Sequence, residues 1–113
     1  AHDLLILKGK GVTARGFESS GGFTIVKGSE VVVAEVNSLF STIRELRKEL
    51  HDNGILTTKG DKYVFTSDYE FNSPSYASCF VLGNNSNGLL YWKDKQGRTL
   101  KSKRAAEVNE DMP

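Results

Sequence analysis

The sequence is poor in the residues that support several common functions. Cys79 is the only cysteine among 113 residues, so no disulfide can form within the chain, and a reducing compartment suits it. The two histidines, His2 and His51, lie far apart, so we expect no metal site and no cofactor. No apolar run approaches the roughly 20 residues that cross a bilayer, and the amino end lacks the pattern of a secretion signal. We therefore expect a cytoplasmic domain without a membrane partner.

Signatures of catalysis are also missing. Asp61, Asp68 and Glu70 lie at turns or alternate with aromatic residues, which is typical of solvent-facing strand ends rather than of a metal cluster. Ser75 does not lie in the Gly-x-Ser-x-Gly turn that presents a nucleophile, and Cys79 has no predicted basic partner. We therefore expect no catalytic residues, and a function in binding rather than in chemistry.

Length and composition predict one small domain. The chain is 38% hydrophobic and 26% charged, and its 11 glycines against 2 prolines indicate many tight turns. A chain of this length buries roughly two-thirds of its surface around one core. We place the domain at 1–100 and a flexible tail at 101–113, because almost no bulky apolar residue follows Leu100. The first residue is alanine rather than methionine, so we expect this chain to be a piece of a longer protein, with another domain upstream.

The amino-terminal part, residues 1–36, is predicted to form strands. An apolar run at 4–7 ends in glycine turns, and an alternating segment at 23–27 lies between glycine-containing turns. Residues 31–36 give a third strand. The β-branched residues and short loops favour an antiparallel arrangement.

A helix is predicted over residues 38–53. Leu39, Ile43, Leu46 and Leu50 recur at helical spacing and form one apolar stripe. The remaining side chains carry balanced charges, so we expect the outer face to be solvated rather than to bind nucleic acid. This face is expected to present Arg44, Glu45, Arg47, Lys48, Glu49 and Asp52.

The rest of the core, residues 37–100, is predicted to alternate helices and hairpins. A turn at 58–61 separates the strands of one hairpin, and a second helix covers 73–82, with Ser73 as its cap and Pro74 in its first turn. A polar loop at 84–88 then leads into a strand at 89–93, and the chain turns back at 95–97. The expected fold class is therefore α+β, with small antiparallel sheets and two helices.

Positive charge is concentrated near the carboxyl end. The net charge is only +1, but six basic side chains against Asp94 give +5 over residues 93–104. A second cluster, Lys8, Lys10 and Arg15, adds +3, while the acids of the last residues resemble a solvated tail. Two interpretations remain open: a solubilising surface, or an electrostatic groove for the phosphates of a nucleic acid.

Several polar or aromatic residues near this basic segment have two interpretations each. Ser73 and Ser75 could bind a phosphate at the helix start or simply cap it. Asn85 and Ser86 could contact bases from a loop whose Asn87-Gly88 step forms a turn. Trp92 could stack on a base or belong to the core. The candidate nucleic-acid-binding residues are Ser73, Ser75, Asn85, Ser86, Trp92, Lys93, Lys95, Arg98 and Lys101.

Several motifs, and the order in which they occur, resemble those of a known family. Phe71 to Ser75, Val81 to Gly83, Asn87-Gly88 and Trp92 to Asp94 resemble an uncharacterised bacterial domain family usually found after GIY-YIG endonuclease domains. Upstream phrases at 14–17, 22–29 and 63–69 fit in the same order, so the resemblance covers roughly residues 4 to 100. The second half is also similar to the restriction-enzyme and adenine-methylase associated (RAMA) domain, which is thought to bind DNA, with modified DNA as one option. The sequence departs from the family where alanines are usual, at Tyr76 and Ser78, and has Leu89 where a tryptophan often follows Asn-Gly.

The resemblance and the basic segment together lead to one expected function. The resemblance implies a non-catalytic accessory domain that binds DNA, most simply duplex DNA, and orients an upstream nuclease domain of the same chain that carries the catalytic residues. The alternative is a protein-interaction or structural module that docks on the upstream domain through its sheet edges or apolar strand faces.

Overall fold

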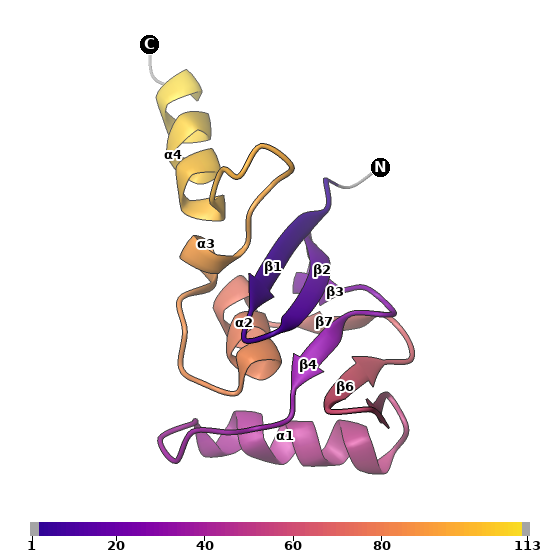
Figure 1. Ribbon diagram of the computed structural model, residues 1–113. Coiled ribbons are helices and arrows are strands. Elements are labelled where there is room, and N and C mark those ends of the chain that lie inside the picture. The colour runs from indigo at the N-terminus through magenta and orange to yellow at the C-terminus, as the bar shows by residue number, and fades with distance from the viewer. Residues whose placement is uncertain (1–2, 112–113) are drawn as a thin grey trace.

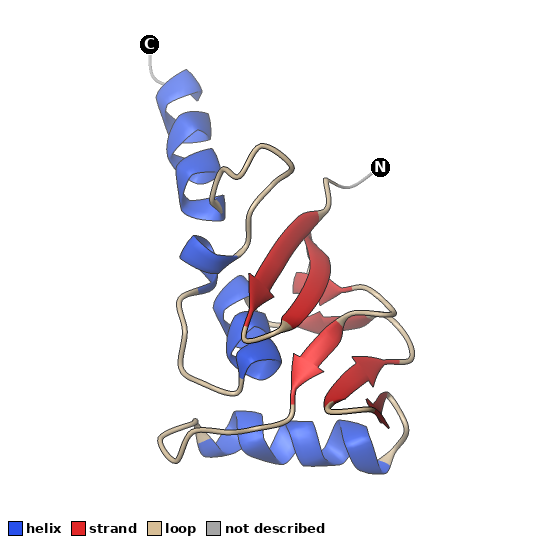
Figure 2. Ribbon diagram, in the orientation of Figure 1, coloured by secondary structure: helices blue, strands red, loops and turns tan. Residues whose placement is uncertain are grey.

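Two antiparallel sheets and four helices form an α+β fold in the computed structural model of the chain, which describes residues 3–111 and their side chains through residue 106 (Figures 1 and 2). The first sheet has the order β1-β2-β3-β7 and the second the order β4-β6-β5. Their strands are β1 Leu5–Gly9, β2 Val12–Ser19, β3 Gly22–Ile25, β4 Glu30–Val32, β5 Leu56–Lys59, β6 Lys62–Phe65 and β7 Tyr69–Phe71. The helices are α1 Ser41–Asp52, α2 Pro74–Leu82, α3 Gly88–Tyr91 and α4 Leu100–Asp111. The predicted fold class is confirmed.

Alternation of apolar and polar residues builds the first sheet. Leu5 and Leu7 point into the core, whereas Lys8 on the intervening face is exposed. The turn between β1 and β2 has positive φ at Lys10 and Gly11, 49° and 81°. β2, the longest strand, was not predicted, because Gly16 and the charged residues of its outer face interrupt the apolar pattern.

The core lies between the sheets and α2. Phe80 of α2 packs its ring 5.6 Å from that of Phe65 in β6 and 5.0 Å from that of Phe71 in β7. Glu30 of β4 accepts a 2.9 Å hydrogen bond from the Thr13 N–H of β2. That bond holds the pKa of Glu30 below its ordinary value, with Lys62 as a further positive neighbour. The aromatic cluster and the hydrogen bond between Glu30 and Thr13 thus connect the two sheets.

The predicted helix 38–53 begins later, at Ser41, and its outer face is less solvated than expected. The sequence placed Arg47 on that face, but only 2% of it is exposed. Its guanidinium donates to the backbone oxygens of Phe80 at 3.0 Å and Val33 at 3.3 Å, and also to that of Val32. A side chain long enough to reach three carbonyls can be buried because each of its three nitrogens finds an acceptor. Arg47 therefore ties α1 to α2 and to the chain after β4.

The strand predicted at 89–93 is wrong, because the chain forms the single turn α3 there. The Asn87 side chain accepts a 3.0 Å hydrogen bond from the Leu89 N–H, and the Trp92 N–H bonds the Gly88 oxygen at 3.1 Å. An asparagine cap at the start of the segment overrides the alternating pattern. Only Lys93 keeps a strand-like pairing, as isolated bridges to Ile6 and Thr99.

Helix α4 runs through most of the segment 101–113 for which we predicted a flexible tail, and residues 112–113 lie outside the described part. Leu100 is 2% exposed, and its N–H bonds the Trp92 oxygen at 3.0 Å. Thr99 caps the helix by accepting a 3.1 Å hydrogen bond from the Ser102 N–H. One anchoring leucine and a cap suffice to start the helix, which projects away from the sheets in Figure 1.

Within residues 3–111 no helix has both the length and the apolar character needed to span a bilayer.

Candidate nucleic-acid interface

The motif residues of the second half bind one another at the start of α2. Ser73 Oγ accepts a 3.0 Å hydrogen bond from the Tyr76 N–H, which is the predicted cap. Ser75 Oγ accepts from the Gly88 N–H at 3.0 Å, and Trp92 Nε1 donates to the Pro74 oxygen at 3.0 Å. We call this set, Ser73, Pro74, Ser75, Gly88 and Trp92, the Ser-Pro-Ser junction.

Close packing makes two members of the junction core residues. A Cβ atom on Gly88 would lie 2.3 Å from the carbonyl carbon of Pro74, so only glycine fits there. Trp92 has 0% exposure, and its ring centroid is 4.5 Å from that of Phe23. The structure agrees with the core interpretation of Trp92, whose ring has no exposed face.

The polar loop 84–88 is likewise held by its own side chains. Asn85 Nδ2 donates to the Ser38 oxygen at 2.7 Å, while its Oδ1 accepts from the Phe40 N–H at 3.2 Å. Ser86 Oγ lies 3.0 Å from Ser78 Oγ, and the Ser86 N–H donates to Cys79 Sγ at 3.2 Å. These bonds fasten the loop to the start of α1 and to α2. We therefore give Asn85 and Ser86 a structural role.

The basic side chains of residues 93–104 divide into two groups. In the first, Arg98 Nε donates to Asp94 Oδ2 at 2.8 Å, and Lys103 Nζ lies 3.7 Å from the same carboxylate. Arg104 pairs with Glu18 of β2. The positive charge of this group is therefore largely neutralised, and Arg98 is a weaker candidate for phosphate contact than its sequence position indicated.

Asp94 organises this neutralised group. Burial acts to raise its pKa, but hydrogen bonds from the Arg98 N–H and guanidinium and from the Gln96 N–H outweigh burial, and the pKa lies below its ordinary value. The backbone bonds are short, 2.9 Å from Arg98 and 3.0 Å from Gln96. Asp94 therefore stays ionised and fixes the turn at 94–98.

The second group meets residues from the amino end. The backbone of Lys93 exchanges hydrogen bonds of 2.7 and 3.0 Å with Ile6 of β1, which brings the two basic clusters of the sequence together. A groove of about 620 Å³ lies at this contact. We call it the lysine groove; it is lined by Ile6, Lys8, Leu90, Tyr91, Lys93, Asp94, Lys95 and Gly97.

The lysines of the groove remain available to a ligand. Among the side chains of residues 3–106, no ion pair joins an acid to Lys8, Lys93 or Lys95. All three are exposed. Asp94 contributes little negative charge to the groove, because it is 9% exposed and already paired. Lys101 is exposed on the first turn of α4, outside the groove.

Among the groove residues that the sequence did not nominate as contacts are two on α3. Leu90 is 50% exposed and Tyr91 39% exposed. The alternating pattern had placed them in a strand. The Asn87 cap was the available signal that a helical turn begins there, because asparagine at this position satisfies the first free N–H groups.

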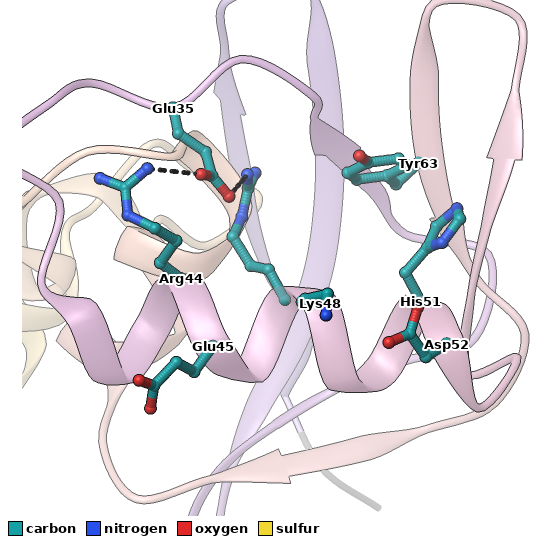
Figure 3. Close-up of a pocket in the computed structure, with 8 residues that line it drawn as sticks. Glu35, Arg44, Glu45, Lys48, His51, Asp52 and Tyr63 are labelled. Carbon is teal, nitrogen blue, oxygen red and sulfur yellow. Dashed lines mark hydrogen bonds and ion pairs between the residues drawn. The ribbon is translucent and has the colours of Figure 1, made fainter.

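A second hollow, of about 370 Å³, lies along α1 and is drawn in Figure 3. Glu35 accepts hydrogen bonds from Arg44 at 2.7 Å and from Arg47 at 2.9 Å. The two arginines that line the hollow are therefore already paired with a carboxylate. His51 Nε2 lies 3.0 Å from Thr58 Oγ1. The hollow mixes both signs of charge and is less suited to a phosphate than the lysine groove. Among the side chains described, those of residues 3–106, no three from His, Cys, Asp or Glu gather closely enough to hold a metal ion.

Comparison with known proteins identifies the family. Residues 5–104 match a family described as a domain of unknown function (DUF4357), and the chain belongs to this family. The match confirms the predicted membership of an uncharacterised domain family. Neither a curated protein nor a solved structure matches the chain.

Proposed function

We propose that this member of the DUF4357 family is a non-catalytic DNA-binding domain that contacts DNA through the lysine groove. The observation that carries the proposal is the gathering around one hollow of three lysines from two distant chain segments, none of which is ion-paired within residues 3–106. Lys8 comes from β1, and Lys93 and Lys95 follow α3. Cations without acidic partners can neutralise phosphates, and each contact releases condensed counterions.

The place of the domain in a larger protein follows from the resemblance given above. We propose that it follows a GIY-YIG nuclease domain and orients that domain on DNA, while the upstream residues perform the cleavage. The RAMA likeness adds modified DNA as a ligand to compare with unmodified DNA. Titration of methylated and unmodified duplexes of one sequence checks this point directly.

Charge reversal in the groove tests the proposal. Fluorescence anisotropy with labelled duplex and single-stranded DNA, at low and moderate salt, should show binding that weakens with salt. Lys93→Glu with Lys95→Glu should abolish it, because both phosphate partners become repulsive.

Lys48→Glu with Lys59→Glu is the matched control, since both lysines are exposed and lie on α1 and β5, away from the groove. It changes the net charge equally and should retain most of the affinity. Absence of salt-sensitive binding, or equal losses in the two double variants, would exclude the groove as the DNA site.

A second candidate function is docking on a protein partner. It is favoured by three exposed apolar side chains on the connection between β4 and α1: Val33 at 40%, Val36 at 38% and Phe40 at 58%. This surface would face the upstream domain of the same chain. Phe40→Ser should weaken such docking and leave DNA binding unchanged, whereas the groove variant should do the reverse.

A further inference from the structure

We propose that the lysine groove receives an unpaired nucleobase, with the Tyr91 ring as its stacking surface. The inference rests on the proposed function and names the form of nucleic acid that the groove accepts. An unpaired base is supplied either by a single strand or by an extrahelical nucleotide in a duplex.

The first argument is that Tyr91 is rigidly presented. α3 begins at the capped Asn87 and at Gly88, whose backbone packs on Pro74, and it is followed at once by the buried Trp92. Tyr91 thus projects from one helical turn that is fixed at both ends, and part of its ring remains open to the groove. A tyrosine on a fixed backbone has only its two side-chain torsions to order on binding, which favours its use as a contact.

The second argument is the shape of the site. Proteins that recognise a duplex through its major groove commonly insert a helix or a β-ribbon there. α3 has four residues and lines a concavity instead of projecting from the surface. A hollow of about 620 Å³ lies in the size range of small-ligand sites, where a nucleotide that has left the base stack fits.

The third argument is the order of chemical groups around the hollow. Leu90 and Tyr91 contribute apolar surface to the lining of the hollow, and its amines come from Lys8 of β1 and from Lys93 and Lys95 after α3, two segments that the Ile6–Lys93 pairing brings together. A base stacked on the ring would have its flanking phosphates near these amines. Sites for unpaired nucleic acid combine aromatic stacking with a basic track in this way.

The experiment compares three labelled DNA probes of equal length: a single strand, a blunt duplex, and a duplex with one unpaired nucleotide. The native chain should bind at least one of the two probes that contain an unpaired base more tightly than the blunt duplex. Tyr91→Ala should lower affinity for that probe by about tenfold and leave the blunt duplex and the salt slope unchanged. Tyr91→Phe should retain the preference, because the ring is kept.

Phe40→Ala is the matched control, since Phe40 is an exposed aromatic residue outside the groove, and it should bind like the native chain. A 2-aminopurine at the unpaired position should lose fluorescence on binding to the native chain but not to Tyr91→Ala. Preference for the single strand alone, or for the bulged duplex as well, identifies the source of the base. Salt-sensitive binding that is equal for all probes and insensitive to Tyr91→Ala overturns this inference and leaves the proposed function standing. No salt-sensitive binding to any probe overturns both.

Discussion

Trp92 of the Ser-Pro-Ser junction is followed directly by Lys93 of the lysine groove, but the two sites use their polar groups in opposite ways. In the junction, every polar contact is internal: Ser75 with Gly88, and Trp92 with Pro74. In the groove, Lys93 and Lys95 are exposed and unpaired among the described side chains. The junction therefore acts as a fixed support, and the groove offers the groups that remain free for a ligand.

This difference changes what the family resemblance implies. The residues that carry the resemblance are held by hydrogen bonds within the chain, Ser73 with Tyr76, Gly88 with Ser75 and Trp92 with Pro74. They specify how α3 is placed on α2. A related function follows only if the residues on α3 and β1 are also suited to it. The experiments must therefore distinguish residues that stabilise the fold from residues that contact a ligand.

Among the variants that test this difference, Trp92→Ala should cause the largest loss of stability. Removing a fully buried tryptophan costs about 4 kcal/mol of the free energy of unfolding, because a cavity forms and the Pro74 oxygen loses its donor. Urea denaturation followed by circular dichroism measures this loss. Trp92→Phe should cost clearly less, since it keeps most of the ring volume. Equal stability of Trp92→Ala and the native chain would contradict the core role.

Gly88→Ala comes next. The added Cβ would lie 2.3 Å from Pro74 and 2.5 Å from the Ser75 nitrogen, so α3 must shift and unfolding should become easier by about 2 kcal/mol. Thermal denaturation tests this expectation. Gly9→Ala is the control, because its Cβ would meet Leu82 at 3.4 Å, an ordinary contact. If both variants were equally stable, the close approach of α3 and α2 would not be required.

The regular elements were predictable from the sequence where one periodic pattern dominated. The stripe ending at Leu50 predicted α1, and the Ser73-Pro74 start predicted α2 within one residue. The hairpin of β5 and β6 followed from its turn at 58–61. These signals are local, so the tertiary structure did not need to be known.

The groove could not be predicted in the same way. Its walls come from β1 and from the segment after α3, joined only by the pairing of Ile6 with Lys93. A lysine's sequence position also does not tell whether an acid lies beside it after folding: Arg98 is paired with Asp94, and Lys95 is not paired among the described side chains. Burial of Arg47 was missed for the same reason, since its carbonyl partners come from other segments.

Asp94→Asn tests the difference between the paired and the unpaired basic groups. It should lower stability less than Trp92→Ala or Gly88→Ala. Because the folded-state pKa of Asp94 lies below its unfolded value, its charge stabilises the fold above about pH 4 and stops doing so as the pH falls through the folded pKa. The variant should therefore be less stable than the native chain at pH 7, and the difference should shrink toward pH 3. Urea midpoints at pH 7, 5 and 3 measure it. A difference that grew on acidification would contradict this role.

The same variant should also tighten DNA binding, because Arg98 and Lys103 lose the carboxylate that neutralises them. The slope of log affinity against log salt should become steeper if the Lys103 amine or the Arg98 guanidinium then reaches a phosphate. An unchanged slope with reduced stability would confine Asp94 to holding the turn.

Lys8→Ala should have the smallest effect and tests whether β1 forms one wall of the interface. Lys8 is exposed on a strand face, so its removal should change the free energy of unfolding by less than about 0.5 kcal/mol. If its amine neutralises one phosphate, the slope of log affinity against log salt should fall by about one unit, the same change that Lys95→Ala should produce. Lys59→Ala, a lysine of β5 outside the groove, should leave the slope unaltered. Equal slopes for Lys8→Ala and the native chain, beside a reduced slope for Lys95→Ala, would move the interface away from β1 and toward the turn at 94–98.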